Sequence, residues 1–420
     1  MKSTIKKLKR LALKTLQKLP PPWFDKLVRL FFSIDLPNGR LKEVQYKIAE
    51  TQDEVEQALR LIQQSYIESK LANCDHIEFR INKYKLLPTT TIFIAKYQDE
   101  VVATASQVMD TGLGLPIESF ISLNDFRKSG RRISEITGLA VKKEWRSQTT
   151  GIFFPLISYS VIYCKEVIGT QDIVIVTRAS VKHFYRAIFG FLPISQKATK
   201  HSGVNNQLSF AQYLVLDKIQ ENFYKLYGPK PPIQKNVYKI FMNFPWREQC
   251  DWKKERYNFL CNYSFTLKTM RYFFSEKSDV LDTLSLEDKK ILHNLYHNKI
   301  YQGLISLENI SYNKRRKHPR FFVNMDLTND KHQSQKIFQI SKAGFSVQGT
   351  SPGEVFEGHI KINNTTECKV KANRVWTSDH VSGYQIVSIE NDKWDDLLHW
   401  VGLKTHENLA TEDQDDLLVA

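Results

Sequence analysis

The stretch Ser134–Lys165, "SEITGLAVKKEWRSQTTGIFFPLISYSVIYCK", decides the fold of the first part of this chain. Its first residues predict a strand that ends near Val141, and the apolar-faced segment Ile152–Ile168 predicts a helix. A short loop that carries Arg146 and Gly151 joins the two. A strand, a loop of backbone N–H groups and a helix N-terminus together can bind an anion. Many junctions of this kind bind nothing, so the loop alone leaves the question open.

Strand and helix patterns alternate on both sides of this stretch, from Val44 to Pro193. The segments "YKIAE", "TTIFIAKY", "EVVATASQVMD" and "DIVIVT" have the composition of strands. Thr51–Ser69 and Val181–Phe189 have the spacing of amphipathic helices. The alternation predicts a mixed α/β domain over residues 44–205, with at least one βαβ unit.

The pattern changes twice after the α/β domain. Residues 206–306 are mostly helical in pattern and rich in aromatic side chains, and Ser285 with Asp288 forms an expected helix N-cap. From Lys314 onward, short strands alternate with turn signals, which predicts a small β-barrel covered by a final helix, Trp394–Val401. The predicted fold is thus an α/β domain with a helical extension, followed by an all-β barrel. Residues 404–420 form an acidic tail.

The composition limits which classes of partner are expected. The chain has 420 residues and a formal net charge of +15, with 42% hydrophobic and 12% aromatic residues, so it is not a disordered chain. A basic excess indicates an anionic partner, which could be a nucleic acid, a membrane surface, a phosphorylated cofactor or an acidic protein. The five cysteines lack CxxC spacing and a His pair at ligand spacing, so we expect no metal site and a reducing cytoplasm.

Residues 1–33 predict basic amphipathic helices rather than a signal peptide, because lysines interrupt the apolar run. The apolar face holds Ile5, Leu8, Ala12, Leu16 and Leu19, and the basic face holds Lys7, Arg10, Lys14 and Lys18. Two interpretations stay open: residues 1–19 lie on an anionic membrane, or they pack on the protein or a partner. The sequence has no run of about 18 apolar residues, so we expect no transmembrane helix. The expected location is cytoplasmic, or peripheral at the inner membrane of a bacterium.

The loop after Val141 resembles the acyl-CoA-binding motif Arg-x-x-Gly-x-Gly of the GNAT acyltransferases. Arg146 and Gly151 match the motif, whereas Thr149 stands at its first glycine. The resemblance implies that these three residues bind the acyl donor. The later segment "FYRAIFGFLP" resembles the GNAT motif whose tyrosine protonates the departing thiolate, a role that falls on Tyr185. The alternative for Tyr185 is a packing role alone.

The segment "MDTGLGLPIESFISLNDFRKSGRRISEITGLAV" resembles the N-acyl amino acid synthases, a branch similar to the acyl-homoserine lactone synthases. The resemblance continues past the α/β core and covers roughly residues 44–300. Many homoserine lactone synthases have an arginine where this chain has Gly138, which argues against a homoserine lactone product. The matching residues are Gly114, Leu115, Pro116, Glu135, Thr137, Leu139, Ala140 and Val141.

This second resemblance implies amide formation, in which an amine attacks the thioester of a long-chain acyl-carrier protein or acyl-CoA. The amine must lose protons, so a positioned carboxylate is a suitable general base, and Glu135 is the candidate. Its alternative is an ion pair with Arg131 and Arg132. Backbone N–H groups on the following strand would stabilise the oxyanion. An acyl-carrier protein is acidic, so a strongly basic enzyme would attract it.

The barrel region carries two motifs in order: an arginine cluster, then "QISKAG" about twenty residues later. The pair resembles the PilZ domain, a small barrel that binds cyclic di-GMP, over residues 313–403. Arginine's planar fork suits phosphate and guanine better than lysine does. The family has Asp or Asn where this chain has a glutamine, so binding could be retained, weakened or lost. The implied ligand residues are Arg315, Arg316, Arg320, Gln339, Ser341 and Gly344.

The sequence therefore predicts a cyclic di-GMP-responsive N-acyltransferase that uses an amino acid or similar amine as acceptor. The rival class is a non-enzymatic cyclic di-GMP effector in which Thr149 and the shifted Tyr185 mark a domain that has lost its chemistry. Nucleic-acid binding is a third and weaker interpretation. Acyl length, acceptor and the choice between carrier protein and coenzyme A stay open.

Overall fold

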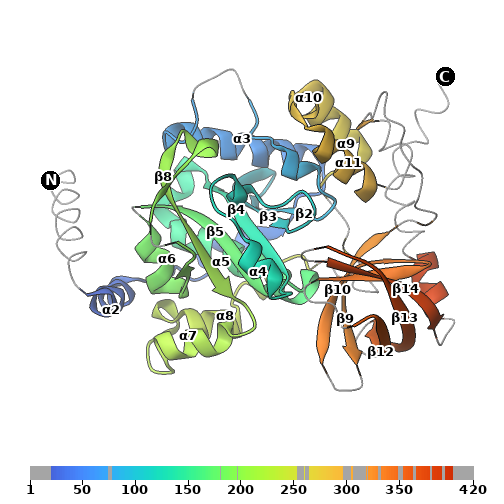
Figure 1. Cartoon of the computed structure of the whole chain (residues 1–420). Coiled ribbons are helices and arrows are strands. Elements are labelled where there is room, and N and C mark those ends of the chain that lie inside the picture. The colour runs from blue at the N-terminus through green and yellow to red at the C-terminus, as the bar shows by residue number, and fades with distance from the viewer. Residues whose placement is uncertain are drawn as a thin grey trace, which may run out of the picture.

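A computed structural model shows a mixed α/β domain beside a β-barrel, as the sequence predicts (Figure 1). In Figure 1 the barrel lies at one end of the α/β domain and helix α2 (Pro21–Phe31) at the other. The structure describes residues 20–73, 78–179, 181–195, 197–252, 260, 264–296, 304–305, 318, 320–329, 333–348, 353–362, 366–378, 381–389 and 393–400.

The α/β domain is built on a sheet of order β1-β2-β3-β4-β5-β8-β6, with β7 paired to β8. β4 and β5 are parallel, and the other neighbours are antiparallel. The predicted strands are confirmed, and β8 extends the sheet beyond residue 205 through its pairing with β5. The strands are β1 (Gln45–Ile48), β2 (Thr90–Tyr97), β3 (Glu100–Met109), β4 (Ile133–Val141), β5 (Asp172–Arg178), β6 (Leu192–Pro193), β7 (Thr199–His201) and β8 (Gln207–Val215).

Two long helices cover opposite faces of the sheet, each over its own hydrophobic cluster. α3 (Gln52–Glu68) begins at Thr51, whose hydroxyl accepts from the Glu54 N–H in a capping box. α5 (Thr149–Tyr163) continues as the π-helix η5 (Cys164–Ile168) and ends at Gly169, which has the left-handed φ of +73°. The segment Thr150–Ile168 is apolar and long enough to cross a membrane, but 72% of it is buried, as expected for a core helix.

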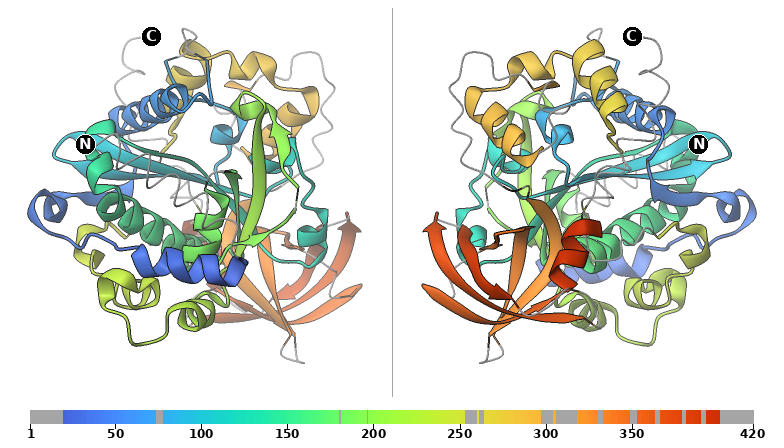
Figure 2. Two further views of the ribbon diagram at one scale, coloured as in Figure 1. Left: turned by 90° about the vertical axis from the view of Figure 1, so that its left-hand side faces the viewer. Right: turned by 90° about the vertical axis from the view of Figure 1, so that its right-hand side faces the viewer.

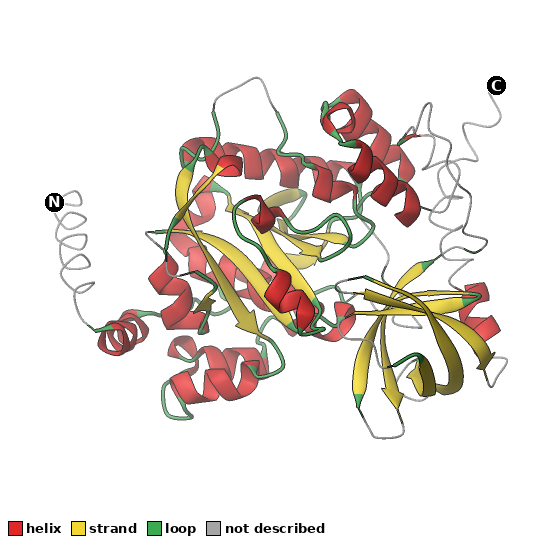
Figure 3. Ribbon diagram, in the orientation of Figure 1, coloured by secondary structure: helices red, strands yellow, loops and turns green. Residues whose placement is uncertain are grey.

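Smaller helices surround these layers. α2 and η1 (Gly39–Glu43) precede the sheet, and α6 (Lys182–Phe189), α7 (Ile219–Tyr227) and α8 (Val237–Asn243) pack with α5. α9 (Leu267–Arg271), η9 (Tyr272–Glu276), α10 (Val280–Thr283) and α11 (Leu286–Leu295) lie near α3 (Figure 3). The predicted cap at Ser285 is confirmed by its hydrogen bond with the Asp288 N–H. The remaining short turns are η2 (Lys83–Leu86), η3 (Pro116–Ser119), α4 (Asn124–Lys128), η4 (Lys143–Gln148), η6 (Ser202–Val204), η7 (Ile233–Lys235) and η8 (Arg247–Gln249).

The C-terminal region forms a closed antiparallel barrel of order β10-β11-β14-β13-β12-β9 around its own hydrophobic core. A helix over residues 393–400 contributes Trp394 and Leu397 to that core. The predicted barrel and its covering helix are confirmed. The strands are β9 (Phe321–Asn329), β10 (Ser334–Ser341), β11 (Gly344–Gln348), β12 (Val355–Lys361), β13 (Glu367–Thr377) and β14 (Val381–Ile389).

The barrel packs directly on the α/β domain (Figure 2). Phe322 and Phe338 of the barrel join the hydrophobic cluster around α5. At the end of η5, the Asn324 side chain donates to the Val167 carbonyl at 2.9 Å. A Cβ at Gly169 would lie 2.0 Å from the Asn324 Oδ1, so only glycine permits this approach.

Candidate functional site

The sheet opens between β4 and β5. The two strands pair only at their start, where Glu135 stands opposite Val174, and then separate. β4 is also bulged, because Thr104 pairs with Ala140 while Ser106 pairs with Thr137. A bulge leaves a residue out of the ladder and turns the strand. The opening therefore exposes both the side chains and the backbone of mid-β4.

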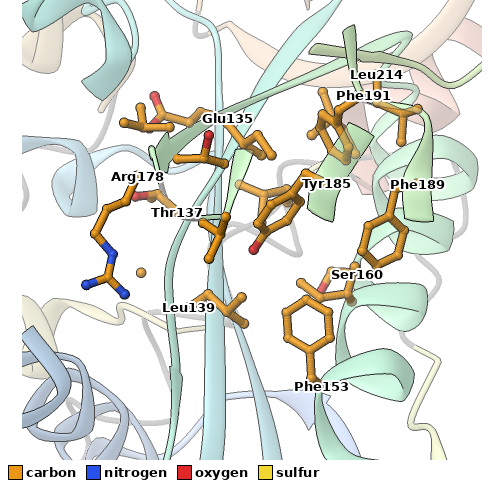
Figure 4. A pocket seen from close by; sticks show the side chains of 18 of the residues that line it. Glu135, Thr137, Leu139, Phe153, Ser160, Arg178, Tyr185, Phe189, Phe191 and Leu214 are labelled. Atoms are coloured by element: carbon orange, nitrogen blue, oxygen red, sulfur yellow. The ribbon is translucent and has the colours of Figure 1, made fainter. Parts of the chain in front are cut away.

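A cavity of about 710 Å³ passes through this opening. On the α3 side it is lined by polar residues, and on the α5 side by aromatic and aliphatic residues from α5, α6, α7 and α8. Figure 4 shows Glu135, Thr137 and Leu139 across the cavity from Tyr185 and Phe191, with Phe153 and Ser160 on α5. The volume is that of an ordinary ligand site, and its two ends suit a polar acceptor and a long apolar chain.

Glu135 lies at the polar end with a strongly perturbed carboxyl group. The side chain is 1% exposed, and its Oε2 accepts a hydrogen bond of 2.7 Å from the Ile117 N–H. Burial raises the pKa of Glu135 to about 8, and the nearby Glu118 carboxylate adds to that rise. A carboxyl group that titrates near neutral pH is suited to accept a proton from an amine.

The alternative of an ion pair between Glu135 and the preceding arginines is wrong for the described structure. Arg131 instead pairs with Asp172 at 2.5 Å and with Asp217 at 2.9 Å. Arg132 donates to backbone carbonyls, including that of Ile168 at 2.6 Å. Both arginines are thus held away from the carboxyl group, whose charge they do not neutralise.

Four further residues at the polar end were not singled out from the sequence. The Arg80 guanidinium stacks 4.4 Å from the Tyr66 ring centroid, and burial lowers the pKa of Arg80. Arg178 faces the cavity from the end of β5, near Tyr66 (Figure 4). His201 of β7 completes the wall, and burial and Arg80 lower its pKa. These residues come from four separate segments, so no spacing in the sequence could indicate that they meet.

Tyr185 lies on the opposite side of the opening from Glu135. Its ring contacts Phe184, Phe189 and Phe191 with centroid distances of 5.9, 6.0 and 5.8 Å. Burial raises the pKa of Tyr185 to about 12, although the Arg178 charge opposes that rise. Tyr185 therefore packs and also lines the cavity, so the predicted packing role and the predicted acid role are compatible.

The predicted donor loop is differently arranged. The Arg146 guanidinium pairs with Glu68 at 2.6 Å and donates to the Val141 carbonyl at 3.1 Å. Thr149 is the first residue of α5, and its side chain is outside the described part. A Cβ at Gly151 would lie 2.7 Å from Leu41 Cδ1, so the helix start is closely covered.

A carboxylate already occupies the N-terminal turn of α5. Thr150 Oγ1 donates to Asp35 Oδ2 at 2.6 Å, and the Asp35 N–H donates back to Thr150 Oγ1 at 3.3 Å. A helix N-terminus favours negative charge, and Asp35 supplies it from the segment before the sheet. A diphosphate at this position would have to displace or approach that carboxylate.

Lys85 is a second buried titratable group beside the bulge. Its Nζ donates to Ser106 Oγ at 2.5 Å, and burial lowers the pKa of Lys85 to about 7. Ser106 Oγ in turn lies 3.5 Å from the position of a Cβ on Gly138, which lines the cavity at φ +63°. Lys85 therefore supports the bulge from behind, and nothing in its local sequence indicated that role.

The predicted dinucleotide residues of the barrel are only partly described. Arg315 and Arg316 lie outside the described residues. Arg320 precedes β9 with its guanidinium 5.9 Å from the Trp376 ring centroid. Gln339 is 7% exposed on β10.

The other two motif residues have structural roles in the barrel. The Ser341 hydroxyl donates to the Gly344 carbonyl at 3.1 Å across the β10–β11 turn. A Cβ at Gly344 would lie 2.1 Å from the Tyr384 carbonyl oxygen, so β14 can approach only a glycine. Within the described part of the barrel, Arg320 is the predicted ligand residue whose side chain lies beside an exposed aromatic ring, that of Trp376.

Residues 57–213 match the family model described as N-acyl amino acid synthase FeeM. The match covers most of the α/β domain and not the barrel. No curated protein matches the chain significantly.

Solved structures that are similar to part of this chain include FeeM, an N-acyl amino acid synthase from uncultured soil microbes, at 19% identity and a TM-score of 0.38. That match covers 43% of this chain and 93% of FeeM. The CoA-dependent acyl-homoserine lactone synthase BjaI is 14% identical with a TM-score of 0.36, over 51% of this chain and 96% of BjaI. The homoserine lactone synthase LasI is 13% identical with a TM-score of 0.33, over 43% and 95%.

Proposed function

We propose that the α/β domain transfers a long acyl group from a carrier-protein thioester to the amino group of an amino acid. The observation that carries the proposal is a continuous cavity that joins the buried Glu135 to an apolar interior. Sequence similarity to the N-acyl amino acid synthase family over residues 57–213 supports the same reaction.

The amine nitrogen attacks the thioester carbonyl carbon at the opening between β4 and β5. A C–N bond forms, the C–S bond breaks, and Glu135 takes the proton that the amine loses. Because the pKa of Glu135 is raised to about 8, the carboxylate form grows as pH rises through that value. The bulge at Gly138 leaves backbone N–H groups of β4 free of the ladder to stabilise the oxyanion.

The departing thiolate needs a proton, and Tyr185 lies on the α5 side, where the acyl chain enters. With its pKa raised to about 12, the phenol stays protonated near neutral pH and can act as the acid. Glu135 and Tyr185 thus have opposite roles on the two sides of one opening.

The acceptor would be recognised by its carboxylate. Arg178 lines the polar end, and its side chain is exposed at the end of β5. Arg80 lies on the same side over Tyr66. An arginine fork pairs bidentately with a carboxylate, so these two residues would hold an amino acid with its amine toward Glu135.

The direct test is to incubate the purified protein with acyl-carrier proteins of different chain length and each of the twenty amino acids. We expect an N-acyl amino acid by mass spectrometry. A decarboxylated amine matched to the best acceptor should react much more slowly in wild type, and Arg178→Gln should abolish most of that preference. Absence of any amide product would favour the rival function, a binding module without chemistry.

The Asp35 carboxylate supports a carrier protein rather than coenzyme A as donor. It lies in the N-terminal turn of α5, where the sequence motif would place the diphosphate of an acyl-CoA. A carboxylate there repels a diphosphate. A carrier protein presents the acyl chain on an arm with a single phosphodiester, and its acidic surface is attracted to a chain of net charge +15.

Replacing Asp35 with asparagine is expected to raise the acyl-CoA rate relative to the carrier-protein rate by roughly fivefold, because one repulsive charge leaves the helix start. The measurement is kcat/KM for both donors with the same acyl chain. Asp125→Asn, at a carboxylate whose side chain is 98% exposed, is the matched control and should leave the ratio unchanged. An unchanged ratio in Asp35→Asn would contradict the donor assignment.

We further propose that the barrel binds cyclic di-GMP, with Arg320 beside the exposed Trp376 as one contact on the barrel wall. Trp376 is 38% exposed, so its ring can stack on a base while the guanidinium reaches phosphate or the guanine edge. Gln339 replaces the Asp or Asn of the family motif and is expected to weaken binding.

Calorimetry on the full chain tests this ligand. Arg320→Ala should weaken cyclic di-GMP binding by at least about tenfold, because a charge-assisted contact is lost. Lys371→Ala removes the same charge from β13 and is the control, and Gln339→Asn should strengthen binding. Competition by duplex DNA at physiological salt would indicate a general nucleic-acid site instead, and the absence of heat with wild type would reject the ligand.

We propose that the protein acts at an anionic membrane surface through α2 and the basic segment before it. On α2, Trp23, Leu30 and Phe31 are 64%, 59% and 78% exposed, and they share one face with Leu27. The next residue after α2, Phe32, lines the acyl cavity. The preceding segment carries Lys2, Lys6, Lys7, Lys9, Arg10, Lys14 and Lys18 and no acidic residue over residues 1–19.

Vesicle flotation tests the membrane proposal. The wild type should float with phosphatidylglycerol vesicles and not with neutral phosphatidylcholine vesicles. Phe31→Glu should reduce flotation, whereas Val355→Glu, at a barrel valine that is 58% exposed, should not. Equal flotation of the two variants would contradict docking through α2.

A further inference from the structure

Arg132 is a buried arginine that joins the two domains. It directly precedes β4 and is 1% exposed. Its Nη1 donates to the Ile168 carbonyl at 2.6 Å, and its Nη2 donates to the carbonyls of Val323 at 3.0 Å and Ile337 at 2.5 Å. These three acceptors belong to η5, β9 and β10, so one guanidinium binds the α/β domain and two barrel strands together.

Burying a charged guanidinium in this way costs more free energy than a merely structural role would justify. Burial lowers the pKa of Arg132 to about 10, and its Nε has no hydrogen-bond partner among the described residues. The charge is satisfied by carbonyl dipoles, one of which lies at the C-terminal end of the α5–η5 helix, where a cation is favoured. Loss of any one of the three segments would leave a buried charge under-satisfied.

Arg132 is also coupled to the catalytic strand. Its carbonyl accepts from the Gln171 N–H at 2.8 Å and from the Asp172 N–H at 3.1 Å, which start the β4–β5 ladder. Glu135 follows three residues later, at the last paired position before the strands separate. A displacement of Arg132 therefore shifts the start of β4 and with it the position of the Glu135 carboxyl.

On the barrel side, the same contact lies next to the region implied to bind the dinucleotide. β10 is irregular between Ile337 and Gln339 in its pairing with both β9 and β11. Ile337 gives its carbonyl to Arg132, Phe338 packs with the α5 cluster, and Gln339 begins the motif. One irregular segment of β10 thus contacts Arg132 and the α5 cluster and also begins the dinucleotide motif.

We infer that Arg132 is the positioning residue through which the barrel strands β9 and β10 hold Glu135 in its catalytic geometry. The inference deepens the proposed acyl transfer and rests on it for its kinetic readout. A ligand that shifts β10 changes the rate by moving Arg132 and not by entering the cavity. Packed interiors transmit such small shifts because they do not deform freely.

The experiment compares Arg132→Lys with Arg131→Lys in the full chain. Arg131 is the neighbouring arginine, but it pairs with Asp172 and Asp217 of its own domain. We expect Arg132→Lys to lose about tenfold in kcat with an unchanged donor KM, since misplacing a catalytic group mainly affects chemistry. The midpoint of its pH–rate profile should also move, whereas Arg131→Lys should keep both values within about twofold.

Hydrogen exchange gives a readout that does not need turnover. Arg132→Lys should speed amide exchange in the β4 peptide 133–141, and Arg131→Lys should not. The wild-type rate by itself tests the proposed function, and the exchange contrast tests the coupling. If Arg132→Lys does not fold, Asn324→Ala weakens the same junction at Val167 and should show the same changes at smaller size. Wild-type exchange and an unmoved pH midpoint in the folded variant would overturn the inference.

Discussion

Acyl transfer by Glu135→Gln is expected to fall by about 10²- to 10⁴-fold, the usual contribution of a positioned general base. Glutamine keeps an oxygen that can accept from the Ile117 N–H, so the loop over the site should stay in place. The remaining activity should come from binding and from the backbone groups of the bulge. The measurement is kcat/KM with a saturating acyl-carrier protein, and a loss below about threefold would contradict the base assignment.

The wild-type pH profile should carry the same information. Because burial raises the pKa of Glu135 to about 8, kcat/KM should rise with pH and reach half its plateau near that value. Glu118→Gln removes the second cause of the rise and should move the midpoint to lower pH. Glu135→Gln should lose the rising limb altogether. A midpoint that Glu118→Gln does not move would assign the limb to another group.

The same pKa shift has a consequence for stability. A carboxyl group with a raised pKa in the folded state binds an extra proton there between pH 4.5, its ordinary value, and about 8. The free energy of unfolding therefore falls as pH rises through that window. Glu135→Gln lacks this loss, so its melting temperature relative to wild type should increase from about pH 5 to about pH 8. A constant difference across that range would argue against a buried, titrating Glu135.

The second large effect concerns the length of the acyl chain. Val237 of α8 is 4% exposed and lines the apolar part of the cavity, together with Ile219 and Phe223 of α7. In Val237→Phe the added ring can extend into the empty volume, so the fold should tolerate it better than overpacking of a filled core. Each methylene that no longer fits costs about 0.8 kcal/mol, so four of them lower kcat/KM by about two orders of magnitude.

We therefore expect Val237→Phe to reject long-chain donors while it retains most of its activity with medium chains. The measurement is kcat/KM over a series of acyl-carrier proteins that differ by two carbons. Val355→Phe places the same ring on the barrel surface, at a valine that is 58% exposed. It should keep the wild-type dependence of kcat/KM on chain length. A parallel decrease at every chain length in Val237→Phe would point to misfolding or to an acyl chain bound elsewhere.

The sequence predicted much of the fold because the relevant signals are local. The strand composition of "TTIFIAKY" and "SEITGLAV", the helical run of Ile152–Ile168 and the cap at Ser285 depend on neighbouring residues, and the structure confirms each of them. β8 was missed because its residues adjoin a segment with a helical pattern, and only its pairing with β5 shows that it belongs to the sheet.

The candidate site, too, was predictable from the sequence only in part. The residue Glu135 could be proposed from sequence, since a recognisable motif surrounds it. Its raised pKa could not, because burial depends on the loop that brings Ile117 over it. The expected ion pair with Arg131 and Arg132 was reasonable for adjacent charges. It is wrong because Asp172 and the carbonyls of η5 and the barrel hold those side chains instead.

By itself, the sequence determined the two kinds of domain and the order of the barrel motifs, and it indicated Glu135 and Tyr185 as candidates, because periodicity and motif spacing are properties of the local chain. Tertiary structure decided which residues meet. It placed Arg80, Arg178 and His201 around one cavity, set Asp35 on the start of α5, and enclosed Arg132 between the domains. The physical reason is that pKa values, steric access and charge satisfaction depend on neighbours that are distant in sequence.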